Sequence, residues 1–330
     1  MKNFIKIICV NIIILIILFF LFEAGLRLFW QMSALKGELY KVSKNRILRY
    51  ELRPNAVQGR VHINSDGFRD KDYSLVKPQG VFRIIVLGDS EAFSQSLALE
   101  DTMPKKLEVE LNKNCLGLDF EVLNMGVEGY NTIQEWEFLK VKGLKYNPDL
   151  VILYYTFNDP DYPEYYFKKN FFNRYFLTIR YFQYRLKKAL IRRDRRIKGI
   201  KSEKENFEYL YSTSAWDHSK EAILKISALA DENKFQFAIV VNPEMSSAVL
   251  NFRDGYPYWY INEKLKELEK NNIAVIDPTY LFKEKDSKVL DLVIGPHDRY
   301  KNAEANSNIA EYILKEFYRR RIINCSGPQY

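Results

Sequence analysis

Short apolar runs alternate with amphipathic stretches along most of the chain. Five runs rich in Ile, Leu, Val, Phe and Tyr, typical of buried strands, cover residues 83–88, 120–124, 150–155, 235–241 and 273–277. Five stretches with helical character separate or follow them, at 104–112, 132–144, 215–233, 260–271 and 303–320. Strands that alternate with helices predict an α/β fold, a parallel sheet with helices on both faces.

Polar motifs follow four of the apolar runs. They are Gly88-Asp89-Ser90, the stretch 124–132, Phe157-Asn158-Asp159 and Asn242-Pro243-Glu244. One polar strand end is ordinary turn chemistry, and a serine there is commonly a helix N-cap. Because the carboxyl ends of parallel strands lie at one edge of a sheet, four such ends are better explained by a ligand site.

A different pattern occupies the beginning of the chain. Residues 7–22 are nearly all Ile, Leu, Val and Phe, preceded by Lys2 and Lys6. The apolar stretch 4–24 is long enough to cross a bilayer as a helix. A cleaved signal peptide is the competing reading, but its apolar region is shorter and ends at a small-residue cleavage site. We therefore expect an uncleaved transmembrane anchor over residues 1–30 and, from Lys2 and Lys6, a body outside the cytoplasm.

Composition and charge narrow the function classes. The chain has 330 residues, 47% of them hydrophobic, and a net charge of +8. Residues 168–204 hold 14 basic and two acidic residues, so the remainder of the chain is net negative. The three cysteines, Cys9, Cys115 and Cys325, form neither a C-x-x-C motif nor a cluster with histidine, which argues against a zinc site. A bridge between Cys115 and Cys325 is left open, and no motif implies a cofactor or any other metal.

The ordered motifs resemble those of the SGNH (GDSL-type) hydrolases, and of their membrane-anchored branch in particular. The resemblance rests on the motif at 88–90, the stretches 64–70 and 77–84, Leu99-Glu100-Asp101-Thr102, and the run 146–152 with Asn147-Pro148-Asp149. It implies a flavodoxin-like three-layer α/β/α sandwich. The domain organisation we expect is an anchor (1–30), a stalk or lead-in (31–63), and an SGNH-like domain (64–330) with a basic aromatic insert at 168–204.

The resemblance also assigns roles to residues at the strand ends. It implies that Ser90 is the nucleophile. The oxyanion-hole donors would be the backbone N–H groups of Ser90 and Gly129 and the side-chain amide of Asn158. Acyl transfer needs a hydroxyl nucleophile and donors aimed at the developing oxyanion. Taken singly, Gly129 would be a turn glycine and Asn158 an Asx-turn residue.

The chain departs from the family pattern before its last helix. The family places its base histidine there, usually in an Asp-x-His or Asp-x-x-His motif. Matching on Asn302-Ala303-Glu304 puts Tyr300 at the histidine position and Asp298 at the acid position. His297 lies three residues earlier and could be the base only if the loop were remodelled. Glu91, directly after the nucleophile, would oppose an oxyanion unless its side chain points away.

Two functions are consistent with these residues. The first is an extracytoplasmic esterase or O-acyltransferase that acts through Ser90, with His297 or Asp298 assisting, on an acylated carbohydrate or other ester. The second is a weakened or inactive relative that binds a glycan or a protein partner in the same cleft. The sequence does not indicate the oligomeric state.

The insert at 168–204 mixes aromatic side chains with its basic residues. An exported body makes nucleic acid a poor candidate for its partner. The pattern is typical of an amphipathic segment on anionic lipid headgroups. A solvated helix that caps the cleft, with its aromatic side chains packed on the domain, is the alternative.

Overall fold

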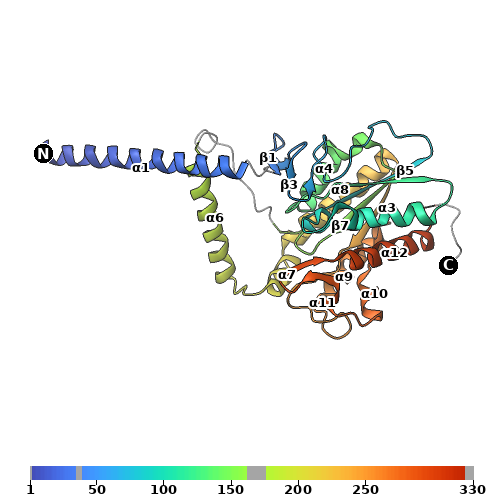
Figure 1. Ribbon diagram of the computed structural model, residues 1–330. Helices are drawn as coiled ribbons and strands as arrows, with labels where there is room; N and C mark the ends of the chain where they lie inside the picture. The colour runs from blue at the N-terminus through green and yellow to red at the C-terminus, as the bar shows by residue number, and fades with distance from the viewer. Residues whose placement is uncertain (1, 35–38, 162–175, 324–330) are drawn as a thin grey trace. The chain divides into compact units, whose positions relative to one another are not determined.

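The computed structural model describes residues 2–34, 39–161 and 176–323 (Figure 1). The chain divides into two compact units. The smaller unit combines Met1–Glu38 with Tyr165–Lys201, and the larger combines Leu39–Glu164 with Ser202–Tyr330.

A five-stranded parallel sheet is the centre of the larger unit. Its strands are β5 (Val81–Gly88), β6 (Asp119–Asn124), β7 (Leu150–Tyr155), β8 (Gln236–Val241) and β9 (Ala274–Ile276). They are arranged in the order β6-β5-β7-β8-β9. This is the flavodoxin-like order 2-1-3-4-5, whose ligand site lies at the carboxyl ends of the first and third strands. The predicted α/β fold with a parallel sheet is confirmed, and here those two strands are β5 and β7.

Helices cover both faces of this sheet. On one face α3 packs against α12, and on the other α4 packs against α8 (Figure 1). The α-helices of the larger unit are α2 (Ser90–Phe93), α3 (Met103–Asn114), α4 (Thr132–Val141), α7 (Glu203–Tyr211), α8 (Ser214–Asn233), α9 (Trp259–Lys266), α10 (Thr279–Glu284), α11 (Val289–Leu292) and α12 (Ala303–Arg319). Short 3-10 helices lie at Leu99–Asp101, Gly143–Tyr146 and Glu267–Asn271. The predicted helices at 132–144 and 260–271 each end in one of these 3-10 turns.

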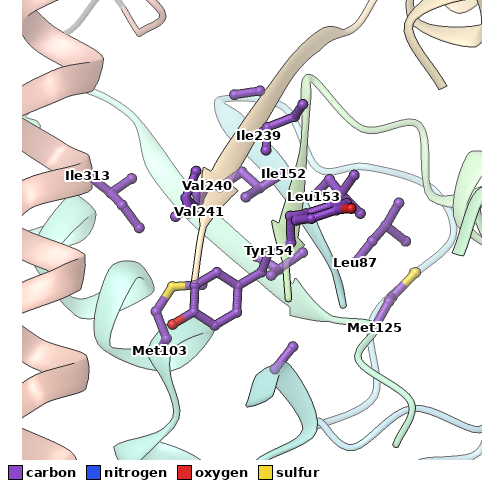
Figure 2. Close-up of a cluster of buried hydrophobic side chains, with 14 of the residues drawn as sticks. Leu87, Met103, Met125, Ile152, Leu153, Tyr154, Ile239, Val240, Val241 and Ile313 are labelled. Atoms are coloured by element: carbon purple, nitrogen blue, oxygen red, sulfur yellow. The ribbon is translucent and has the colours of Figure 1, made fainter. Parts of the chain in front are cut away.

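The core lies between the sheet and its helices. Ile84 to Leu87 of β5 have fully buried side chains, as expected for a central parallel strand. Figure 2 shows the ring of Tyr154 of β7 beside Met103 of α3. Close packing on both faces fixes the carboxyl ends of β5 and β7, where the polar motifs begin.

Three small antiparallel pairs accompany the main sheet. They are β1 (Tyr40–Val42) with β2 (Tyr50–Leu52), β3 (Val57–Gln58) with β4 (Val61–His62), and β10 (Val293–Gly295) with β11 (Asp298–Lys301). Leu48, Leu52 and Val61 are buried in the main core. Residues 39–63, expected as part of a stalk or lead-in, therefore pack into the larger unit.

The smaller unit contains α1 (Lys2–Ala34) and α6 (Leu177–Ile197). Within α1, the stretch Asn3–Leu28 is long and apolar enough to cross a membrane, as a signal sequence also can be. The first part of the basic insert, residues 168–175, lies outside the described residues. Cys325 does too, whereas Cys115 is buried with its Sγ 3.1 Å from the Tyr318 hydroxyl.

Candidate active site

Ser90 is the first residue of α2 and lies two residues after the end of β5. Asp89 is the N-cap of this short helix, and its Oδ1 accepts a hydrogen bond of 3.1 Å from the backbone N–H of Glu91. The loop after β6 presses against α2 at Gly126. A Cβ added to Gly126 would lie 2.6 Å from the backbone N of Phe93, so only glycine lets the loop approach so closely. The Asp89 cap and the close contact at Gly126 together fix the position of Ser90.

The carboxylate of Asp89 accepts hydrogen bonds from polar groups that follow two neighbouring strands, β5 and β7. Its Oδ1 accepts from Thr156 Oγ1 at 3.0 Å, and its Oδ2 accepts from Asn158 Nδ2 at 3.1 Å. The Ser90 hydroxyl lies 3.4 Å from the same Oδ2. Ser90 and Asn158, predicted from strands that are far apart in the sequence, are therefore brought together by one carboxylate oxygen. The role of Asp89 in this contact was not predicted from the sequence.

Gly129 lies in a tight turn after β6. Its φ of +75° is in the left-handed region that favours glycine, and the Tyr130 N–H closes the turn on the Val127 carbonyl at 3.0 Å. The preceding residue, Glu128, is held by hydrogen bonds from Tyr40 and Tyr50, at 2.8 Å to its carboxylate and 2.7 Å to its backbone carbonyl. The turn that carries Gly129 is therefore fixed by the β1–β2 pair.

Tyr300 lies close to Ser90. It lies on β11, and its hydroxyl interacts with the side chain of Ser90. Burial raises the pKa of Tyr300 to about 12, although the interaction with Ser90 acts in the opposite direction. The carboxylates of Glu91, Glu128 and Asp89 also raise it. The phenol is consequently neutral at pH 7.

The structure places His297 and Asp298 differently from Tyr300. His297 is exposed in the turn between β10 and β11, and no hydrogen bond joins its ring to Ser90 in the described part of the chain. Asp298 accepts a hydrogen bond of 3.3 Å from the backbone N–H of Tyr300 through its Oδ1. Asp298 thus helps to shape the strand that carries Tyr300.

The charge of Glu91 is opposed by a buried lysine. Lys301 is 1% exposed, and its Nζ lies 3.1 Å from Glu91 Oε2. Burial raises the pKa of Glu91, and Lys301 lowers it. Glu244, from the fourth polar strand end, belongs to the same group. Its pKa is raised to about 8 by burial and by Glu203 and Glu91, against the effect of Lys301.

Two further buried carboxyl groups interact electrostatically with Asp89. Glu135 of α4 and Asp159 are each 1% exposed, and burial, together with Asp89 and, for Asp159, Glu135, raises both pKa values well above the ordinary range. Burial therefore favours the neutral form of both groups over the charged form. Glu135 was missed from the sequence because a glutamate in the first turn of a helix usually faces solvent. Among the residues the structure describes, no group of three or more His, Cys, Asp or Glu side chains is placed to hold a metal ion.

The chain is similar to several solved structures of ester-cleaving proteins. A member of the lipolytic G-D-S-L family from Veillonella parvula matches at 15% identity and a TM-score of 0.42, over 72% of this chain and 99% of its own. An acetyl xylan esterase matches at 15% identity and a TM-score of 0.41, over 71% and 99%. An acetyl-xylooligosaccharide esterase from Geobacillus matches at 11% identity and a TM-score of 0.43, over 76% and 97%.

No protein-family profile and no curated protein matches the chain. At the identities and scores of these structural similarities, the function has to be argued from the residues of the site itself. Those residues are a serine at the end of a central strand, an amide from the next strand, a turn glycine and a tyrosine. The sheet that carries them is the flavodoxin-like α/β sheet predicted from the sequence.

Proposed function

We propose that the protein is a serine esterase or O-acyltransferase of the SGNH type, in which Ser90 is the nucleophile. One observation carries the proposal. The Ser90 hydroxyl and the Asn158 amide both lie within hydrogen-bonding reach of Asp89 Oδ2, at 3.4 and 3.1 Å, at the carboxyl ends of β5 and β7. Acyl transfer requires a nucleophile and an oxyanion donor held close together, and their shared contact with Asp89 holds Ser90 and Asn158 in that way.

The first step would form an acyl-enzyme. Ser90 Oγ attacks the carbonyl carbon of the ester, the new Oγ–C bond forms, and the carbonyl oxygen takes up negative charge. The donors for this oxyanion would be the N–H groups of Ser90 and Gly129 and the second amide hydrogen of Asn158. The bond to the leaving alcohol then breaks. Water or an acceptor hydroxyl then attacks the acyl carbon, the Oγ–acyl bond breaks and the proton of the attacking group returns to Ser90 Oγ, which gives hydrolysis or O-acyl transfer.

Tyr300 would handle the proton of this reaction. A phenol with a pKa of about 12 is ionised in about one molecule in 100,000 at pH 7, so it is a poor base by itself. A neutral phenol can still relay a proton: its oxygen accepts the Ser90 proton while its own proton passes to the departing alkoxide. The relay leaves Tyr300 neutral. It also implies a turnover below that of an enzyme with a histidine base.

The substrate we propose is an acylated carbohydrate or another ester outside the cytoplasm, reached by a body anchored through α1. Lys2 precedes the candidate span Asn3–Leu28 and Lys6 lies in its first turn, and both favour a cytoplasmic N-terminus. Recovery of the full chain in the membrane fraction after alkaline carbonate extraction tests the anchor. Release into the soluble fraction would contradict it.

A second candidate function is favoured by the protonation state of Tyr300. A weakened or inactive relative would keep the cleft and bind a glycan or a protein partner without cleaving an ester. Such a protein needs no base beside Ser90, and a neutral phenol there supplies only a hydrogen bond.

The two functions are separated by turnover of p-nitrophenyl acetate. We expect the wild type to exceed Ser90→Ala, with Ser96→Ala as a control at a neighbouring serine outside the site. A large loss in His297→Ala would assign the base to that exposed ring instead of Tyr300. Equal turnover of the wild type and Ser90→Ala would contradict acyl chemistry at Ser90 and favour the binding function.

A further inference from the structure

Helix α6 carries a stripe of large apolar side chains that are more than half exposed in the described part of the chain. Phe182, Leu186 and Leu190 are 59%, 61% and 52% exposed. A spacing of four residues places them on one face of the helix. Ile197, 72% exposed, lies on the same side. Large apolar side chains gathered on one exposed helix face mark a surface that meets a partner or a membrane.

The beginning of α6 is fastened to α1. Phe176, the N-cap of α6, provides no side-chain cap. Instead, Glu23 of α1 accepts a hydrogen bond of 2.8 Å from the backbone N–H of Thr178. Glu23 is 4% exposed and is paired with Arg27 at 2.8 Å. A carboxylate at the N-terminus of a helix accepts a hydrogen bond from a backbone N–H that has no acceptor within the helix. Its negative charge also complements the helix dipole.

Aromatic contacts support the same junction. The rings of Phe22 and Phe182 lie 5.9 Å apart, and those of Phe19 and Phe176 lie 5.4 Å apart. Figure 1 shows α6 leaving the side of α1 near its C-terminal part rather than running along it. The apolar stripe of α6 therefore begins directly against the apolar surface of α1.

The junction lies near one end of the candidate membrane span. Glu23 is five residues before the end of Asn3–Leu28, which is about 7–8 Å along a helix. Interfacial helices lie about 5–10 Å deep at the boundary between headgroups and acyl chains. A helix that starts at this depth and runs crosswise to the span lies in that boundary.

The charge of α6 fits an anionic surface. Arg185, Arg193, Arg195 and Arg196 are all exposed, and the helix has one acidic residue, Asp194. Basic side chains beside an apolar stripe are typical of helices that bind anionic lipid surfaces.

We propose that α6 lies on an anionic lipid surface, with Phe182, Leu186 and Leu190 in the interface, as a second attachment beside the transmembrane helix. The proposal rests on the anchoring by α1 proposed above. The exposed stripe of α6 would contact the same bilayer that α1 spans, because the stripe is continuous with the apolar surface of α1 through Phe22 and Phe182.

The test uses the full chain in lipid nanodiscs, with Cys9→Ser to remove the exposed native thiol. A fluorescent probe is attached to Leu186→Cys, and in a matched variant to Arg195→Cys, which is nine residues on and half a turn around the helix. The protein without either new cysteine serves as the labelling blank. Lipids spin-labelled near the top of the acyl chain quench a probe that lies in the interface.

In discs that contain phosphatidylglycerol, we expect quenching at least two-fold stronger at position 186 than at position 195. We expect that difference to shrink in discs of phosphatidylcholine alone. Equal quenching at the two positions, in discs that contain the protein, would overturn the placement of α6 and leave the anchor standing. Protein recovered outside the discs would overturn both. A difference that is the same in both lipids would overturn the recognition of anionic headgroups.

Discussion

The ammonium group of Lys301 lies 3.1 Å from the carboxylate of Glu91, the residue that directly follows Ser90. Lys301 is next to Tyr300 on β11, so this ion pair ties the strand that carries the tyrosine to the helix that carries the serine. The ion pair also bears on the expectation that the charge of Glu91 would oppose an oxyanion at Ser90. The negative charge of Glu91 is balanced by a lysine that has almost no contact with solvent.

Breaking this pair should destabilise the protein. In Lys301→Met, Glu91 and Glu244 lose the cation that opposes them, and we expect the free energy of unfolding to fall by about 3–5 kcal/mol. The double variant Glu91→Gln/Lys301→Met should lose about 1–3 kcal/mol less than the two single variants together. Urea denaturation of the four proteins measures this coupling. Strict additivity would show that the ion pair is not formed in solution.

Exchanging Tyr300 tests its part in the reaction. Tyr300→Phe removes the hydroxyl that contacts Ser90, and we expect kcat to fall about 100-fold, at the low end for the loss of a proton-transfer group. Tyr300→His places an imidazole of ordinary pKa near 6.5 at the same position, which should raise kcat/KM above the wild type at pH 7–8. Activity against p-nitrophenyl acetate measures both. An unchanged kcat in Tyr300→Phe would remove the tyrosine from the proton path.

Glu244 should make stability depend on pH. Its pKa in the folded protein is raised to about 8, whereas in the unfolded chain it is that of an ordinary glutamate, near 4.3. Between these values the folded protein holds a proton that the unfolded chain releases. Its contribution to stability is therefore fully present below pH 4 and is lost as pH rises through 8.

The measurement is urea denaturation of the wild type and Glu244→Gln from pH 5 to pH 8.5. The glutamine cannot ionise, so the free energy of unfolding should decline less steeply with pH in the variant. Glu135 and Asp159 stay in both proteins and contribute equally to the two curves. Parallel curves would mean that Glu244 has an ordinary pKa in the folded protein.

The sequence predicted the sheet well because buried parallel strands are nearly continuous apolar runs. Ile84 to Leu87 and the run 150–155 are examples, and each ends in the structure where its polar motif begins. The meeting of Ser90 and Asn158 followed from the same argument, since the carboxyl ends of β5 and β7 lie at one edge.

The remaining parts of the site depend on contacts that no local pattern encodes. The stretch around Pro296 and His297 had the composition of a loop, but it forms the turn of an antiparallel pair that brings Tyr300 to Ser90. Glu135 looked like a solvent-facing helix residue, and its burial follows from the way α4 packs on the sheet. Residues 39–63 looked too polar for a core, although Leu48 and Leu52 supply apolar side chains to it.

Trapping the acyl group gives a direct test of acyl chemistry at Ser90. The full chain is mixed with p-nitrophenyl acetate, quenched in acid within seconds, digested and analysed by peptide mass spectrometry, beside Ser90→Ala treated in the same way. We predict one acetyl group on Ser90 of the wild type and none on the corresponding peptide of the variant. Ester cleavage by the wild type with Ser90 unmodified, and undiminished in Ser90→Ala, would contradict this prediction.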